Sequence, residues 1–89
     1  MADENIEKKV RGEVTDILAE ELKVKREEIR DNSNLQQDLG ADSLDAVEVI
    51  MKLEEKYSIE IPDDDAQKLT TAGQIMEYIS GKVKGKGQY

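Results

Sequence analysis

Apolar residues recur at spacings of three and four in three stretches of the chain, and this pattern predicts three amphipathic helices. The first covers residues 3 to about 20, the second runs from Asp42 or Ser43 to about Tyr57, and the third begins at Thr71. The predicted core faces are formed by Ile6, Val10, Val14, Ile17 and Leu18 in the first helix, by Ala46, Val49, Ile50, Leu53 and Tyr57 in the second, and by Ala72, Ile75, Met76, Ile79 and Val83 in the third.

The stretches between these helices predict one short helix and no sheet. Residues 24–39 form a long first connection, and its apolar residues are expected to pin it to the core: Val24, Ile29, Leu35 and Leu39. After Pro62, the segment 63–69 has acidic residues first, where the helix dipole favours them, and predicts a short helix. Polar and apolar residues alternate over residues 58–61, but this segment is too short for a stable strand. The expected fold is all-α, a small antiparallel bundle of three longer helices and one short helix.

A length of 89 residues favours one domain. We expect this domain to span residues 1–80, because the segment from Gly81 to Tyr89 alternates glycine with lysine and is typical of a flexible tail.

The second helix carries a second apolar stripe, formed by Leu44, Val47 and Met51, in addition to its core face. A helix that buries one face does not need a second stripe, and acidic side chains surround this one. We interpret it as a docking surface. The alternative is that the stripe, Leu44 in particular, packs beneath the long first connection.

The start of the second helix combines a cap with a hydroxyl. Asp42 suits the N-cap position, and Asp45 stands three residues later, where a capping box places its second acid. Ser43 then falls in the first turn, beside the positive end of the helix dipole, which favours an attached phosphate. On cap chemistry alone, an ordinary first-turn serine explains the same pattern.

Negative charge is concentrated in the middle of the chain. The net charge is −8, and residues 38–65 alone contain ten acids and two bases. Such a surface repels nucleic acid and anionic lipid, and it attracts a protein with a basic patch. If the charge were spread evenly, a merely solubilising surface would explain it equally well.

The composition excludes several kinds of site. The chain has neither histidine nor cysteine, which excludes a Ser-His-Asp triad, a thiol nucleophile and a structural zinc site. An EF-hand starting at Asp63 would need Gly and Glu where Lys68 and Gln74 stand, so no specific metal site is expected beyond weak divalent binding. No apolar run is long enough to span a membrane, and the N-terminus resembles neither a signal peptide nor a transit peptide.

The run Asp38-Leu39-Gly40-Ala41-Asp42-Ser43-Leu44-Asp45 resembles the attachment signature of acyl carrier proteins of the dissociated, bacterial-type (type II) fatty acid synthase. The likeness continues through Val47-Glu48, Leu53-Glu54-Glu55, Ile59-Glu60-Ile61-Pro62-Asp63 and Thr70-Thr71. The resemblance implies that Ser43, flanked by Asp42 and Leu44, is esterified with 4′-phosphopantetheine by a transferase that uses coenzyme A. It implies a carrier of acyl thioesters rather than an enzyme.

The resemblance also implies further site residues and partners. The implied partner-recognition surface consists of Asp42, Asp45, Val47, Glu48, Met51, Glu54 and Glu55. The implied acyl pocket consists of Leu53, Ile61, Ala66 and Leu69. Leu35 stands where the family often has phenylalanine. The expected partners are the transferase, synthase enzymes with basic docking patches, and acyl chains, but neither nucleic acid nor an inserted membrane. The expected state is a monomer in the bacterial cytoplasm, or the mature form of an organelle protein.

Three other functions compete with this one. A serine hydrolase of the GDSL type is disfavoured, because Ala41 interrupts the block and there is no histidine to act as the base. A stand-alone polyketide carrier would use the same attachment chemistry. An acidic, non-enzymatic adaptor would need no cofactor at all.

Overall fold

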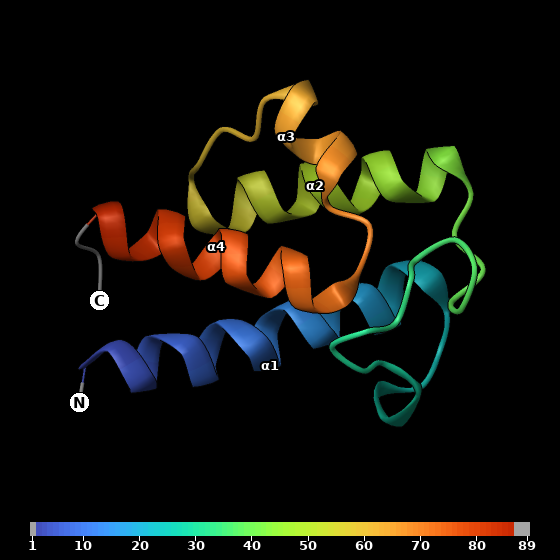
Figure 1. Ribbon diagram of the computed structural model, residues 1–89, viewed down its shortest axis with the longest axis horizontal. Helices are drawn as coiled ribbons and strands as arrows, with labels where there is room; N and C mark the ends of the chain where they lie inside the picture. The colour runs from blue at the N-terminus through green and yellow to red at the C-terminus, as the bar shows by residue number, and fades with distance from the viewer. Residues whose placement is uncertain (1, 87–89) are drawn as a thin grey trace.

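The protein is all-helical in the computed structural model, which describes residues 2–86 (Figure 1). The elements are α1 (Ala2–Leu22), a 3-10 helix η1 (Arg26–Glu28), α2 (Ser43–Tyr57), α3 (Asp63–Lys68) and α4 (Ala72–Lys86). Within these residues there is no strand, and the only bridge joins Asn34 to Thr71. The expected fold class is therefore confirmed.

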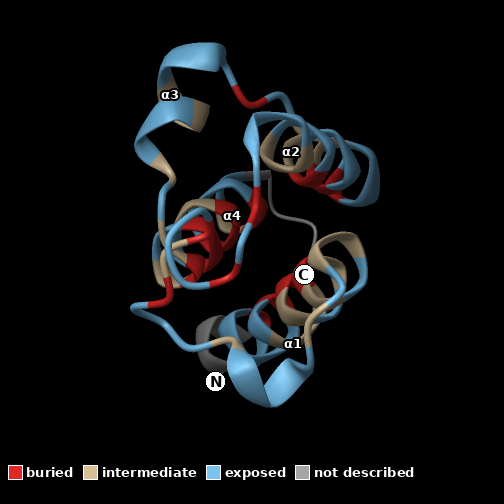
Figure 2. Ribbon diagram, turned by 90° about the vertical axis from the view of Figure 1, so that its right-hand side faces the viewer, coloured by how far each residue is buried: buried red, intermediate tan, exposed pale blue. Residues whose placement is uncertain are grey.

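Three long helices enclose the core. α1 packs along both α2 and α4, and both of these run antiparallel to it (Figure 1). The buried sides of α1, α2 and α4 face one another (Figure 2). Eight aliphatic side chains are fully buried: Val10, Val14, Leu18, Val49, Leu53, Ile75, Ile79 and Val83. The predicted core faces are confirmed, except that Ile17, Ala46 and Ile50 are only half-buried.

The long first connection is fastened to the start of α4. Leu35 and Leu39 are buried, and Val24 and Ile29 pack against the core, as expected. The backbone N–H of Gly73 also donates to the carbonyl of Asp31 over 2.8 Å. A Cβ at position 73 would lie 2.8 Å from that carbonyl oxygen, so the contact requires glycine.

α4 extends further than the sequence pattern indicated. The predicted domain boundary at residue 80 falls too early, because residues 81–86 continue the helix. Val83 is fully buried in the core, and this burial outweighs the low helix propensity of Gly81 and Gly85. The last three residues of the predicted tail, 87–89, lie outside the described part of the chain.

Candidate functional site

The N-terminus of α2 is closed by a capping box of two aspartates. The Asp45 N–H donates to Asp42 Oδ1 over 2.8 Å, and the Asp42 N–H donates to Asp45 Oδ2 over 3.3 Å. The predicted cap is thus confirmed, with the second bond longer because aspartate is shorter than the usual glutamate. This box sets where α2 begins and therefore places Ser43 as its first residue.

A tight loop delivers the chain to that cap. Gly40 has a φ of +73°, a left-handed conformation that favours glycine. Directly after it, Ala41 is buried, and its N–H donates to the Leu35 carbonyl over 2.8 Å. Within the same loop, Asp38 Oδ2 accepts from the Asn34 N–H over 2.7 Å. These bonds hold the start of α2 against the core while leaving its tip in solvent.

Ser43 is exposed at this tip and lines one end of a groove. The chain contains no histidine or cysteine that could act as a base or a nucleophile beside it. An exposed hydroxyl without a base is suited to being modified rather than to attacking a substrate itself. Its place at a helix N-terminus also fits a phosphodiester, because the dipole offsets part of the repulsion from Asp42 and Asp45.

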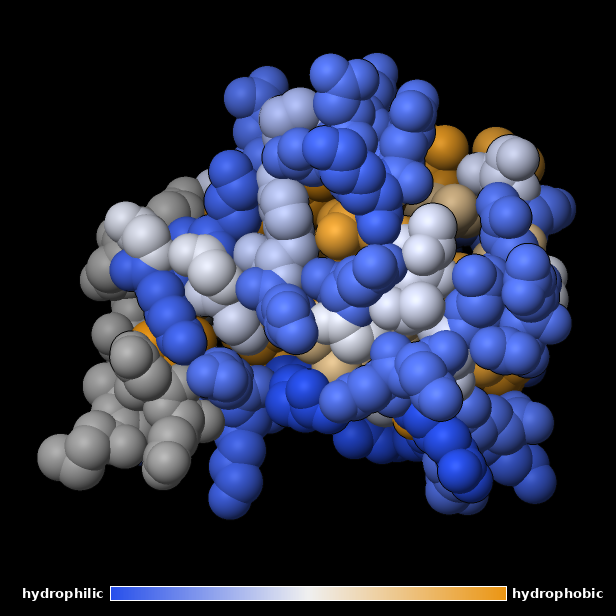
Figure 3. Space-filling model, in the orientation of Figure 1, coloured by the Kyte–Doolittle hydropathy of each residue, from blue (hydrophilic) through white to orange (hydrophobic). Residues whose placement is uncertain are grey.

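The second stripe of α2 faces solvent. Leu44, Val47 and Met51 are 69%, 54% and 53% exposed, so Leu44 does not pack beneath the connection. Figure 3 shows apolar atoms at the end of the molecule where α2 begins, among polar side chains. Of the acidic residues expected around the stripe, Asp42, Glu48 and Glu55 are exposed, and Asp45 and Glu54 are half-buried.

Glu54 has a structural contact as well as its place near the stripe. Its Oε2 accepts a 2.8 Å hydrogen bond from the backbone N–H of Ile61, in the segment that leads into α3. The carboxylate therefore ties α2 to the start of α3. Sequence reasoning assigned Glu54 only to the recognition surface and missed this bond, which links residues seven positions apart.

A groove of about 640 Å³ opens between α2 and α3. Three of the four residues expected in an acyl pocket line it, namely Ile61, Ala66 and Leu69. Leu53 does not line the groove; it is fully buried in the core. Sequence reasoning missed four residues of α2 that line the groove: Ala46 and Ile50, which it placed on the core face, and Val47 and Met51, which it assigned to the exposed stripe.

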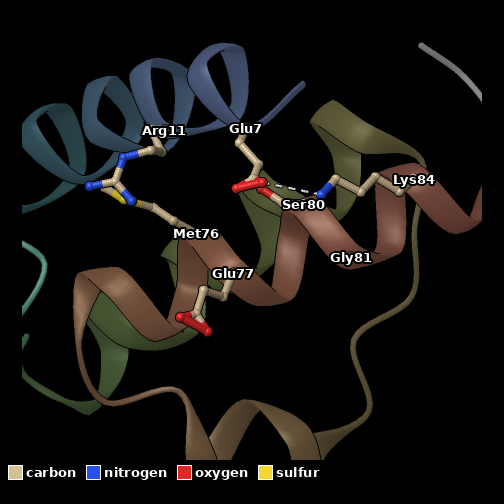
Figure 4. Close-up of a pocket in the computed structure, with 7 residues that line it drawn as sticks. All are labelled: Glu7, Arg11, Met76, Glu77, Ser80, Gly81 and Lys84. Atoms are coloured by element: carbon tan, nitrogen blue, oxygen red, sulfur yellow. Dashed lines mark hydrogen bonds and ion pairs between the residues drawn. The ribbon is translucent and has the colours of Figure 1, made fainter. Parts of the chain in front are cut away.

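A second, smaller cavity of about 280 Å³ lies between α1 and α4 (Figure 4). The Glu7–Lys84 ion pair, with 3.2 Å between Oε2 and Nζ, lies across it, and Arg11, Met76 and Ser80 are among its walls. Arg11 is itself paired with Asp31. This cavity has charged walls and lacks Ser43, so it is separate from the groove at the start of α2.

Metal and membrane sites were also sought among the described residues. No group of three or more acidic side chains there is arranged to hold a metal ion, and no helix there is long and apolar enough to cross a membrane. Within the acidic run of α3, Asp65 accepts a hydrogen bond from Tyr78 instead.

Two comparisons connect this site to known proteins. The family described as "Phosphopantetheine attachment site" matches residues 12–79. A protein of Wolinella succinogenes named "Acyl carrier protein" is 48% identical over 67 residues, which cover 75% of this chain and 88% of that protein. The matched region contains the capped start of α2, the groove and α3.

Proposed function

The chain belongs to the acyl carrier proteins, and on this premise we propose that it delivers growing acyl chains to the enzymes of a dissociated fatty acid synthase. It is a carrier rather than a catalyst, and its cofactor is covalently attached 4′-phosphopantetheine. When bound, the cofactor supplies the thiol that the cysteine-free chain lacks. The observation that carries the proposal is the exposed Ser43, placed by a capping box on the wall of the groove between α2 and α3.

Ser43 is the proposed attachment residue, with Asp42 and Leu44 as its neighbours at the cofactor. Incubation with coenzyme A and a broad-specificity phosphopantetheinyl transferase should add one phosphopantetheine, measured as intact mass, and Ser43→Ala should abolish the gain. Ser58 is a matched control because it is also exposed, and Ser58→Gly suits its left-handed backbone at the C-cap of α2. Absence of the gain, or its persistence in Ser43→Ala, would rule out the proposed carrier.

The proposed recognition surface is the acidic face of α2 together with its exposed stripe. It consists of Asp42, Asp45, Val47, Glu48, Met51, Glu54 and Glu55. Carboxylates around a small apolar patch favour fast, salt-sensitive encounters with basic partners, which suits a carrier that must leave each enzyme quickly. The proposed partners are the transferase and synthase enzymes with basic docking patches.

A charge reversal tests this surface. Glu48→Lys should lower kcat/KM for phosphopantetheine transfer at least tenfold at low salt and much less at high salt, because added ions screen the interaction. Glu20→Lys in α1 changes the net charge equally at an exposed site outside α2 and should have little effect. An equal loss in the two variants would show that net charge, rather than this surface, governs the encounter.

The groove is the proposed acyl site. Its support is the apolar lining by Ala46, Ile50, Ile61, Ala66 and Leu69, with Ser43 at one end. The family resemblance implies Leu53 as a further pocket residue, but Leu53 is buried in the core and does not line the groove, so we leave it out. Ala66→Phe should fill the groove and expose long acyl chains, so their thioesters should be cleaved faster by hydroxylamine. Equal cleavage of long and short chains in the unmodified sequence would contradict this site.

A stand-alone polyketide carrier would use the same chemistry at Ser43. An assay with condensing enzymes of fatty acid and of polyketide synthesis distinguishes the two functions, because each kind of carrier is accepted by the enzymes of its own pathway. We further propose that the protein acts as a monomer in the bacterial cytoplasm, or in an organelle as a mature form. The bacterial source of the relative supports the first of these locations.

A further inference from the structure

α3 forms one wall of the groove but is held differently from the long helices. It has six residues, none of them buried, and its N-cap, Pro62, supplies no side-chain hydrogen bond. Asp63, Ala66 and Gln67 of this helix line the groove. Any displacement of α3 relative to α2 must therefore change the width of the groove.

Two side-chain hydrogen bonds restrain α3, one at each neighbouring helix. Glu54 of α2 accepts from the Ile61 N–H, just before α3 begins. From α4, the Tyr78 hydroxyl donates to Asp65 Oδ2 over 2.7 Å. The first bond fixes the segment that enters α3, where Ile61 is itself buried. The second is the side-chain bond that joins the body of α3 to α4.

Tyr78 is a stable donor for this bond. Burial, together with the hydrogen bond to Asp65 and the charge of that carboxylate, raises the pKa of Tyr78 to about 12. The phenol therefore keeps its proton throughout the neutral range. Lys82 Nζ lies 5.4 Å from the centre of the ring, and Tyr78 also packs against the core. These contacts keep the ring in place when only its hydroxyl is removed.

We propose that the Tyr78–Asp65 hydrogen bond is a latch that holds α3 against α4 and thereby sets the opening of the groove. Its effect on acyl chains rests on the proposed function of the groove. With the latch released, α3 pivots about the fixed Ile61 segment, and the wall that contains Ala66 moves away from α2. Tyr78 is thus a positioning residue, since it does not line the groove itself.

The molecule contains a matched control for this latch. Tyr57 donates to Glu13 Oε1 over the same distance, 2.7 Å, and joins α2 to α1. Neither Tyr57 nor Glu13 lines the groove. Replacing either tyrosine by phenylalanine removes one hydroxyl and leaves its carboxylate acceptor without that donor. The two variants therefore differ mainly in which pair of helices loses its hydrogen bond, α3 and α4 or α1 and α2.

The first test uses the protein without its cofactor. Amide hydrogen exchange by NMR should be at least about tenfold faster at Ala66 and Leu69 in Tyr78→Phe, as expected for loss of one hydrogen bond to a charged acceptor. Both amides donate to carbonyls within or next to α3, those of Pro62 and Ala66. Tyr57→Phe should leave their exchange unchanged, and Asp65→Ala should reproduce the effect from the other partner. Equal exchange in Tyr78→Phe and Tyr57→Phe would overturn the latch.

The second test adds the acyl chain. Acetyl- or octanoyl-phosphopantetheine is transferred to the Ser43 hydroxyl from the corresponding coenzyme A thioester, with release of adenosine 3′,5′-bisphosphate, and thioester cleavage by hydroxylamine is measured. Octanoyl cleavage should be several-fold faster in Tyr78→Phe than in Tyr57→Phe, with acetyl cleavage equal. If the octanoyl thioester of the unsubstituted protein is cleaved as fast as the acetyl thioester, the groove does not bind acyl chains. The hydrogen-exchange result then still tests the latch on its own. If octanoyl is protected equally in both variants, the latch does not control the groove.

Discussion

Different interactions hold the two sides of the molecule, the side formed by α1, α2 and α4 and the side formed by α3. On one side, α1 packs along α2 and α4 over fully buried aliphatic side chains such as Val14, Leu53 and Ile79. On the other, α3 buries no residue completely: half-buried Ala66 packs against the core, and two hydrogen bonds, at Ile61 and at Asp65, restrain the helix. Core burial resists any displacement, whereas a hydrogen bond is lost for a small free-energy cost. The first side thus supplies most of the packing stability, and the second is the side on which the proposed latch acts.

The largest effect is expected in the buried side. Ile79→Ala should lower the free energy of unfolding by about 2–5 kcal/mol, because Ile79 is fully buried. Leu69→Ala, at a half-buried residue that lines the groove, should cost less than half as much. Urea denaturation measures both. Ile79→Val, expected to cost about 1 kcal/mol, keeps the comparison possible if the alanine variant does not fold. Equal costs for Ile79→Ala and Leu69→Ala would contradict the division into two sides.

A pH above 10 should weaken the attachment of α3 to α4. The pKa of Tyr78 is raised to about 12 in the folded protein from an ordinary value of 10, so folding favours the protonated phenol. Its contribution to stability is therefore complete below pH 10 and is lost as the pH rises towards 12. Ultraviolet titration compared with Tyr78→Phe should show Tyr78 ionising near pH 12, and Asp65→Asn should bring that transition to lower pH. An unchanged transition in Asp65→Asn would show that Asp65 has no part in the shift.

The restraint at Ile61 should have a smaller, local effect. Glu54→Ala removes the carboxylate that accepts from the Ile61 N–H and should lower the free energy of unfolding by about 1–2 kcal/mol. Glu55→Ala, the neighbouring exposed acid, should stay within about 0.5 kcal/mol of the unmodified protein. Thermal unfolding of the pair separates the hydrogen bond from the loss of one negative charge. Similar values for both would show that charge, not the bond, is responsible.

The loop that leads to Ser43 should respond to backbone strain alone. A Cβ at Gly40 meets no atom within 4 Å, but the φ of +73° disfavours other residues, so Gly40→Ala should cost about 1 kcal/mol. A Cβ at Gly12 also meets nothing within 4 Å, yet it lies inside α1. Gly12→Ala should instead stabilise the protein by about 0.5–1 kcal/mol. Chemical denaturation should give opposite signs, and the same sign for both would contradict the assigned backbone conformations.

The smallest effect is expected at the cavity between α1 and α4. Lys84→Gln removes the ion pair with Glu7, whose two side chains are partly exposed, and should change the free energy of unfolding by less than about 0.5 kcal/mol. The effect should disappear at high salt. A larger loss of unfolding free energy that does not depend on salt would mean that this ion pair contributes to the packing of α1 against α4.

Local sequence patterns were enough to predict the helices and the cap of α2. Periodicity located the core faces, and the capping box of α2 follows from two residues three positions apart, Asp42 and Asp45. Exposure of Leu44 also agrees with the docking interpretation.

The features that the sequence did not reveal depend on contacts between distant elements. Ile50 and Leu53 lie on the same apolar arc of α2, and only the position of α3 decides that Ile50 lines the groove and Leu53 does not. The Tyr78–Asp65 bond joins two helices, and no local spacing indicates it. The extent of α4 differs for a similar reason: the sequence placed Val83 on the core face yet assigned Gly81 onwards to a flexible tail, and packing against the core continues the helix to Lys86.

The antiparallel packing of α1 and α4 also decides how the carrier tolerates attachment to other molecules. The start of α1 and the end of α4 lie side by side at one end of the bundle, and Ser43 lies at the opposite end (Figure 1). A tether, tag or neighbouring domain joined near either helix end is therefore held away from Ser43, the proposed attachment residue. The same unit can be anchored to a surface, or inserted into a longer polypeptide through one pair of adjacent junctions, with its loading end facing outwards.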